Sequence, residues 1–133
     1  MIRLSLQTGA RTELVDLTGR LQDAVRQNGW RDGLLHVFTP HTTAGVTINE
    51  GADPSVRRDI LATLARLVPH RGDYEHAEGN SDAHVKASMT GSGAWVPVEG
   101  GALALGTWQA VYFAEFDGPR SRSVWLHFIP AAS

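Results

Sequence analysis

The sequence predicts one mixed α+β domain that spans residues 1–133, and three observations support this fold class. A length of 133 residues is common for a single domain built around one hydrophobic core. The composition, 42% hydrophobic and 20% charged, is that of an ordinary globular protein rather than a disordered chain. Segments that alternate apolar and polar residues, as β-strands do, are interleaved with segments of helical periodicity.

The first elements along the chain are expected to be a β-hairpin and a helix. Alternation over residues 2–17, interrupted by a glycine-containing turn at 8–10, predicts the hairpin. Asp16 or Thr18 can cap the helix that follows, and residues 28–29, Asn-Gly, provide its end. The buried face of this helix is predicted to consist of Leu21, Ala24 and Val25.

Two strands and a second helix are expected next. The apolar and β-branched runs at 34–39 and 45–50 predict two strands joined by a turn that contains His41. The dipeptide Asp53-Pro54 favours the start of a helix, because aspartate caps free amide groups and proline suits the first helical position. This helix should run to about Val68, with a buried stripe formed by Val56, Ile60, Leu64 and Leu67.

A third helix and a final hairpin complete the expected domain. Asn80 or Ser81 can cap the helix, which should extend through Met89 with Gly91 just beyond its end. Residues 107–116 and 123–129 then alternate on either side of Asp-Gly-Pro-Arg, which is typical of an antiparallel hairpin.

Bulk charge and residue usage exclude several classes of function. Twelve basic and fourteen acidic residues give a net charge of −2, so nucleic acid is not an expected partner. The chain has no cysteine, which restricts any metal site to histidine and carboxylate ligands. No apolar run reaches the roughly 20 residues of a membrane span, and the start does not resemble a signal peptide. We therefore expect a cytoplasmic protein with no membrane partner.

The polar segment 76–84 is the first candidate for chemistry. It contains His76 and His84 together with Asn80, and it has almost no apolar residues. If the third helix starts here, its N-terminus attracts anions, and the imidazoles could bind a metal. The spacing matches no known zinc motif, so a solvated, capped loop is an equally good interpretation.

A second candidate is the turn that begins at His41. Thr42 and Thr43 follow it and supply hydroxyl donors suited to phosphate, although the same residues are also simply good turn formers. Glu50 shares strand parity with Val46, so its carboxylate is expected to point inward as a ligand, as a base or as a group that fastens a loop.

The predicted last hairpin carries further polar candidates. Gln109 and Glu115 interrupt an apolar row at its two ends, which suggests a lined cavity. Arg120 and Arg122 flank the turn and could bind a phosphate or a carboxylate, or they could be ordinary surface residues.

Four separated motifs give the sequence a family resemblance. Residues 41–50 read HTTAGVTINE and are followed by Asp53-Pro54; the other three are EGNSDAH at 78–84, LGTWQ at 105–109 and EFDGPR at 115–120. Together they resemble the YjbQ-like family, which is often described as secondary thiamine-phosphate synthase. The match extends from about residue 34 to residue 129.

The resemblance implies a compact α/β sandwich of mostly antiparallel strands with two to three helices, assembled as a homotrimer. It implies a small phosphorylated metabolite as substrate, and a weak or secondary ability to join a pyrimidine diphosphate to a thiazole phosphate with release of pyrophosphate. Carried over by position, it implies a metal or phosphate site that contains His41, His76 and His84. Glu50, Gln109 and Glu115 would be polar groups of the same pocket.

From these residues we expect His41, His76 and His84 to hold a divalent metal, zinc or magnesium. Glu50, His41 and Glu115 are the candidate catalytic groups. The candidate anion ligands are Thr42, Thr43, Asn80, Gln109 and Arg120. Two other functions stay open, namely a metal-dependent hydrolase of a phosphorylated or acylated metabolite and a non-catalytic sensor of an anion or metabolite.

Overall fold

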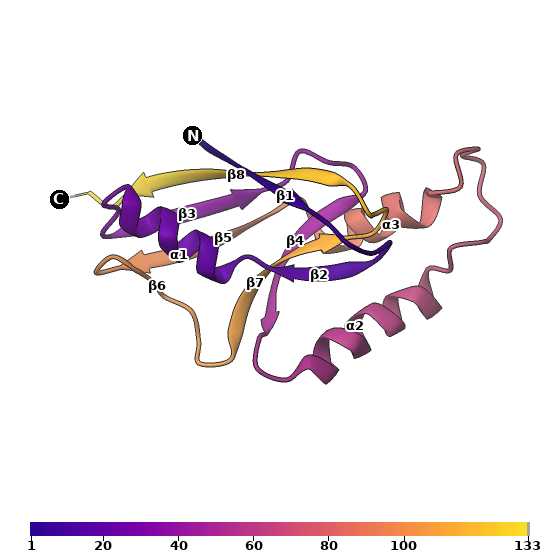
Figure 1. Cartoon of the computed structure of the whole chain (residues 1–133), viewed down its shortest axis with the longest axis horizontal. Helices are drawn as coiled ribbons and strands as arrows, with labels where there is room; N and C mark the ends of the chain where they lie inside the picture. The colour runs from indigo at the N-terminus through magenta and orange to yellow at the C-terminus, as the bar shows by residue number, and fades with distance from the viewer. Residues whose placement is uncertain (133) are drawn as a thin grey trace.

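The computed structural model describes residues 1–132, which form eight strands and three helices (Figure 1). The helices are α1 (Thr18–Gln27), α2 (Pro54–Leu67) and α3 (Ser81–Thr90). The strands are β1 (Ile2–Gln7), β2 (Glu13–Asp16), β3 (Gly33–Phe38), β4 (Ala44–Glu50), β5 (Gly93–Glu99), β6 (Ala102–Leu103), β7 (Gln109–Glu115) and β8 (Ser121–Pro130).

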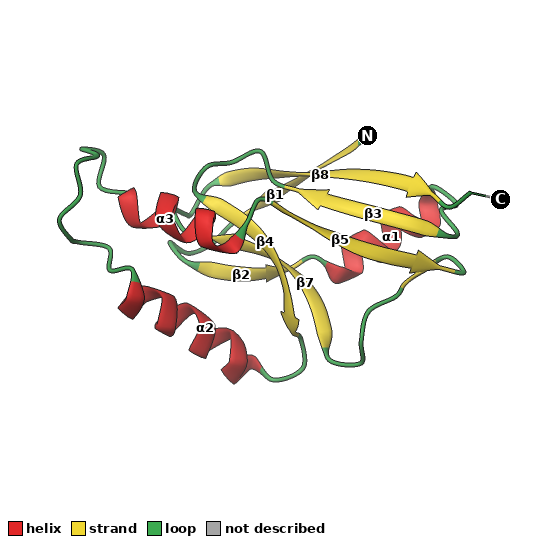
Figure 2. Cartoon of the chain, turned by 180° about the vertical axis from the view of Figure 1, so that it is seen from behind, coloured by secondary structure: helices red, strands yellow, loops and turns green. Residues whose placement is uncertain are grey.

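The strands form two sheets in which every pair within residues 1–132 is antiparallel. One sheet has five strands in the order β1-β8-β3-β5-β6, and the other has three in the order β2-β7-β4. Figure 2 shows β8, β3 and β5 side by side, with α1 behind them. The expected α+β class, with antiparallel strands and three helices, is confirmed.

Two hydrophobic cores hold these layers together. The first lies between the two sheets and receives the buried face of α1, and its largest members are Leu17, Leu21, Leu35, Phe113 and Leu126. The second lies on the other face of the three-stranded sheet, where Tyr112 and Phe116 pack against Ala83 and Ala87 of α3. The three-stranded sheet is therefore the middle layer, covered on both faces.

The three helices begin and end close to where local signals predict. The side chain of Asp53 accepts a hydrogen bond of 2.9 Å from the amide of Ser55, as a helix cap does. The buried residues of α1 are Leu21, Ala24 and Val25, as expected. None of the helices formed by residues 1–132 is long and apolar enough to cross a membrane.

The two predicted hairpins are wrong, although their strands exist. β1 pairs with β8 and β2 pairs with β7, so the chain changes sheets between β1 and β2. It changes sheets again between β7 and β8. Alternation predicts a strand but not its partner, and here each turn-like connection carries the chain from one layer to the other.

The prediction of a buried stripe on α2 is also wrong. The structure describes all residues of α2 and none of them is buried; Leu67 is 66% exposed. Ile60, Leu61 and Leu64 pack only partly against the second core. The helix lies at the margin of the molecule (Figure 1), where it packs against the second core on one side only.

Candidate functional site

Three connections between the two sheets meet at one end of the molecule, and we call them the crossovers. They comprise residues 8–12, 39–43 and 116–120. Backbone hydrogen bonds join them directly: the amide of Thr8 donates to the carbonyl of Arg120 at 2.9 Å, and that of Phe116 donates to the carbonyl of Thr43 at 3.2 Å. Segments more than 100 residues apart in sequence therefore form one compact corner.

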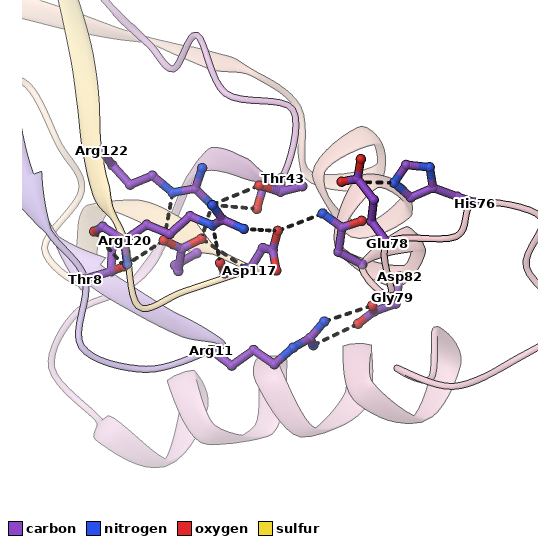
Figure 3. A network of polar contacts seen from close by, with 12 residues as sticks. Thr8, Arg11, Thr43, His76, Glu78, Gly79, Asp82, Asp117, Arg120 and Arg122 are labelled. Carbon is purple, nitrogen blue, oxygen red and sulfur yellow. Dashed lines mark hydrogen bonds and ion pairs between the residues drawn. The ribbon is translucent and has the colours of Figure 1, made fainter.

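A buried ion pair between Arg122 and Glu115 ties the crossovers together. Arg122 Nε donates to Glu115 Oε1 at 2.8 Å, and its Nη2 donates to Thr43 Oγ1 at 2.9 Å (Figure 3). Glu115 also accepts from the hydroxyl of Thr8 at 2.7 Å and from the amide of Asp117 at 3.1 Å. Burial alone would raise the pKa of Glu115, but the hydrogen bonds from Arg122, Thr8 and Asp117 outweigh it and hold the pKa below its ordinary value.

A second buried carboxylate fixes the start of α3. Asp82 is fully buried and receives two hydrogen bonds of 3.1 Å from Arg11 of the first crossover. Lys86, one helical turn further on, donates to it at 3.0 Å. Burial would raise the pKa of Asp82, but these hydrogen bonds from Arg11 and Lys86 lower it overall. The first turn of α3 is thereby anchored to the crossovers.

A hollow of about 360 Å³, lined mostly by polar and charged side chains, opens above the crossovers. We call it the polar hollow. Asp117 organises its floor: one carboxylate oxygen accepts from Asn80 Nδ2 at 2.8 Å and from Arg120 Nη2 at 3.1 Å. The lining residues are Pro40, His41, Thr42, Thr43, Glu78, Asn80, His84, Asp117, Arg120 and Arg122. Two guanidinium groups, two threonine hydroxyls and two imidazoles thus converge on one space.

A second hollow of about 400 Å³ adjoins the polar hollow, and we call it the side hollow. The two share Pro40, His41, Thr42 and His84. The other lining residues of the side hollow are Phe38, Thr39, Ala87, Ser88 and Ser92. The polar hollow is lined by charged groups, whereas the side hollow is lined by carbon surfaces and hydroxyls.

His41 stands between the two hollows with its ring orientation fixed. The backbone amide of Ser123 donates to Nε2 of His41 at 2.9 Å, so the neutral ring carries its proton on Nδ1. Burial lowers the pKa of His41, nearby Arg122 lowers it further, and Glu115 opposes the change. His41 is therefore a neutral group that can offer one N–H donor.

The three candidate metal ligands are not gathered around one point. The rings of His76 and His84 meet edge to face, with centroids 5.3 Å apart, and His76 Nε2 lies 3.6 Å from Glu78. Both ring nitrogens of His41 are occupied, one as an acceptor and one by its proton. Over residues 1–132, no group of three or more metal-ligating side chains comes together. This arrangement does not fit a centre of three histidines, and the metal stays a prediction.

Two of the candidate pocket residues lie at the far end of the three-stranded sheet. Glu50 pairs in register with Gln109, six residue pairs from the partnership of Ala44 with Glu115, or about 20 Å along the strands. Glu50 accepts a hydrogen bond from the amide of Ala52, and Gln109 accepts one from the amide of Gly106. Both side chains thus help to close local loops.

The remaining candidates divide into two groups. His41, Thr42, Thr43, Asn80, His84 and Arg120 all line the polar hollow. Glu115 lies beneath it, with its oxygens bonded to other protein groups.

Sequence reasoning missed the contribution of Asp117 and Thr8. Asp117 lies inside the EFDGPR motif, which was a usable signal, whereas Thr8 contacts Glu115 across 107 positions with no local signal.

Comparison with protein families and with known proteins adds an independent finding. A family model described as UPF0047 protein YjbQ-like matches residues 2–131. UPF0047 protein MJ1081 of Methanocaldococcus jannaschii is 44% identical over 129 residues, which cover 97% of this chain and 94% of that protein. UPF0047 protein YugU of Bacillus subtilis is 43% identical over 124 residues, or 92% and 94% of the two chains.

Solved structures are similar over almost the whole chain. An uncharacterised conserved protein of the YjbQ/UPF0047 family from Clostridium acetobutylicum is 52% identical, with a TM-score of 0.95, and the match covers 97% of this chain and all of that one. The conserved hypothetical protein TT1486 of Thermus thermophilus is 43% identical with a TM-score of 0.90, and the match again covers 97% and 100%.

Proposed function

This chain belongs to the YjbQ-like UPF0047 family, and from that premise and the polar hollow we propose that it is an enzyme that acts on a small phosphorylated metabolite. The observation that carries the proposal is the convergence of hydrogen-bond donors on the polar hollow. Arg120, the hydroxyls of Thr42 and Thr43, and the Nδ1–H of His41 come from two crossovers that backbone hydrogen bonds hold together.

These donors suit a phosphate group for a physical reason. A phosphate offers several oxygen acceptors, and a guanidinium binds two of them at once. The main-chain oxygen and the carboxylate of Asp117 hold Arg120 at 2.7 and 3.1 Å, which orients its remaining N–H groups. Arg122 already has Glu115 as its counter-ion, so it supports Thr43 rather than adding a free charge. The hollow therefore binds the anion mostly through oriented hydrogen bonds.

The reaction we propose is the one that the family resemblance implies, in which a pyrimidine diphosphate is joined to a thiazole phosphate. In the pyrimidine substrate, the bond between the diphosphate oxygen and the carbon that carries it breaks, and pyrophosphate leaves. A bond forms between that carbon and the thiazole nitrogen. Arg120, Thr42 and Thr43 stabilise the negative charge that grows on the leaving oxygen. His84, which lines the same hollow, supplies a proton to the pyrophosphate.

Binding and turnover test the proposal in two steps. Titration of the purified protein with inorganic pyrophosphate, followed by calorimetry, is expected to show saturable binding that Arg120→Gln weakens by about tenfold or more. Arg58→Gln, which removes the same charge from an exposed position of α2, is the matched control and should have no effect. If pyrophosphate and phosphate both fail to bind, the proposal is wrong.

Turnover is then measured as formation of thiamine phosphate from the two substrates. His84→Gln should slow the reaction while pyrophosphate binding persists. Equal turnover in His84→Gln and the unchanged protein would remove His84 from the mechanism. Elemental analysis of untagged protein tests the predicted divalent metal separately. No step of the proposed reaction depends on a metal.

We also propose that the chain assembles as the expected homotrimer. The support is apolar surface that its own fold leaves uncovered, including Leu67 on α2, 66% exposed, and Trp108, 65% exposed. Sedimentation equilibrium at several concentrations measures the assembly, and Leu67→Glu should weaken it. A monomer at every concentration would contradict this proposal.

A further inference from the structure

An exposed tryptophan lies at the end of the three-stranded sheet that is opposite to the crossovers. Residues 51–53, which connect β4 to α2, and residues 104–108, which connect β6 to β7, lie there side by side (Figure 1), and we call them the far loops. The amide of Gly51 donates to the carbonyl of Trp108 at 2.8 Å and joins the two loops. Trp108 itself is 65% exposed.

Hydrogen bonds hold the chain around Trp108 in place, so its exposure is built into the fold. The amide of Gln109 donates to the carbonyl of Gly106 at 3.0 Å, and the side chain of Gln109 accepts from the amide of Gly106 at 2.8 Å. A tryptophan buries a large apolar area when it is covered, and tryptophans are enriched among the residues that dominate binding at protein interfaces. The LGTWQ motif at 105–109 lines neither hollow and therefore has the character of a docking element.

The side hollow is suited to receive such a ring. Its lining includes Phe38, Pro40 and Ala87, together with hydroxyl residues such as Ser88. Among residues 1–132, no Asp, Glu, Lys or Arg lines it, so an apolar ring enters without removing water from a charged group. Its volume of about 400 Å³ is within the range of sites that hold whole small molecules, so one indole fits.

A chain does not place its own Trp108 in its own side hollow. Residues 39–42 of the side hollow come just before the start of β4, whereas Trp108 comes just before the start of β7. Because β4 and β7 pair antiparallel, these two starts are at opposite ends of the sheet, about 20 Å apart. In a closed ring of three copies, each contact joins two different surface patches of neighbouring copies. The far loops and the side hollow can be these two patches.

We propose that Trp108 of a second copy occupies the side hollow, so that each site of the proposed homotrimer is completed by the far loops of its neighbour. Gln109 follows Trp108 and pairs with Glu50, so the contact brings both of these polar residues of the second copy to the margin of the polar hollow. His41 and His84 line both hollows, so the docked ring also covers one side of the proposed phosphate site. This inference rests on the proposed homotrimer and adds its interface and the residues that a neighbour contributes.

Thiol cross-linking tests the contact directly, because the chain has no cysteine of its own. One chain carries two exposed substitutions, Ser88→Cys at the side hollow and Thr107→Cys in the far loops. A short bismaleimide is expected to link copies of this double variant into covalent dimers and trimers on a denaturing gel, and to link neither single variant. In the control, Asp23→Cys replaces Ser88→Cys. Asp23 is exposed on α1, which packs on the opposite face of the three-stranded sheet from α3.

Sedimentation equilibrium of the double variant, measured before cross-linking, separates the possible failures. A trimer that yields no linked products would overturn this contact and leave the proposed homotrimer intact. Linking of Ser88→Cys alone would mean that two side hollows face each other, which would also overturn it. A monomer would contradict the homotrimer and this inference with it. Failure of pyrophosphate to bind would contradict the proposed enzyme but not the contact.

The energetic role of Trp108 is tested in the assembly of otherwise unchanged chains. Trp108→Ala should raise the concentration at which half of the chains are assembled by about tenfold or more. Ser88→Trp, which fills the side hollow from its own chain, should have a similar effect. Trp95→Ala is the control, because it removes a tryptophan that is 51% exposed on the five-stranded sheet, and it should leave assembly unchanged. Equal assembly of Trp108→Ala and the unchanged protein would overturn the proposal.

Discussion

The guanidinium of Arg122 and the carboxylate of Glu115 form an ion pair that is almost completely shielded from water, directly beneath the polar hollow. Arg122 is the second residue of β8 and Glu115 is the last residue of β7, so the pair spans the crossover between the two sheets. Its other hydrogen bonds reach Thr8 and Thr43 in the remaining crossovers. The shape of the candidate site therefore depends on this charge pair. Arg122 lines the polar hollow, whereas Glu115 lies beneath it.

Glu115→Gln should destabilise the protein strongly. The substitution keeps the size of the side chain but leaves the buried charge of Arg122 without a counter-ion, which typically costs about 3–5 kcal/mol. Urea denaturation followed by circular dichroism measures the loss. Glu99→Gln, at an exposed position of β5, is the matched control and should change stability by less than about 0.5 kcal/mol. Similar losses in the two variants would show that the ion pair does not organise the corner.

Stability should fall steeply in acid because two buried carboxylates have lowered pKa values. Hydrogen bonds hold Glu115 and Asp82 ionised in the folded state, against the opposing effect of burial. As the pH falls, the unfolded chain therefore binds protons at a higher pH than the folded protein does. The stabilisation is complete above the ordinary carboxyl pKa and is lost as the pH falls through the lower pKa values of the folded state.

The free energy of unfolding, measured by urea denaturation at a series of pH values below about 5, checks this expectation. In Glu115→Gln one of the two titrating groups is absent, so the slope against pH should become shallower. An identical slope in both proteins would contradict the assignment to Glu115.

His41 should titrate below the ordinary histidine range. Burial and the charge of Arg122 lower its pKa, and protonation would also remove the acceptor that the amide of Ser123 uses. Because the folded pKa is depressed, the contribution of His41 to stability is complete above the ordinary histidine pKa. It is lost as the pH falls through the folded value.

NMR of the histidine ring nitrogens checks both statements about His41. The nitrogen shifts should identify the tautomer with its proton on Nδ1, and the midpoint of the titration should lie below that of a free histidine. His41→Asn, which lacks the titrating ring, identifies the signal by its disappearance. A midpoint at or above that of a free histidine would contradict the assignment of His41 as a half-buried, neutral ring.

The sequence predicts the parts of this fold that depend on neighbouring residues. Asp53-Pro54 specifies the start of α2 because a cap and the first helical position act within one turn. Local patterns do not predict strand pairing, because β1 pairs with β8, and Ile2 lies opposite Leu126 across 124 positions of sequence. The same distinction applies to the site. The HTT turn and the segment near His84 were predicted from local polarity, whereas the separation of Glu50 and Gln109 from them depends on strand direction.

Gly118→Ala should disturb the candidate site through the backbone alone. A Cβ at this position would overlap the carbonyl oxygen of Ala10 and lie 2.9 Å from Thr8 Oγ1, so the first and third crossovers would have to separate. The amide of Gly118 also donates to the carbonyl of Arg11 at 3.0 Å, and separation would stretch that bond. Overpacking of this kind costs roughly 1–3 kcal/mol.

The same displacement would move Arg120 relative to Thr43, so pyrophosphate binding should weaken by more than the loss of stability alone explains. Calorimetry at a temperature where Gly118→Ala is fully folded separates the two effects. Gly19→Ala is the control, because a Cβ there meets nothing within 4 Å and alanine favours the helix α1. Gly19→Ala should therefore retain full binding with equal or higher stability. If Gly118→Ala also retains full binding, the close contact of the crossovers does not shape the polar hollow.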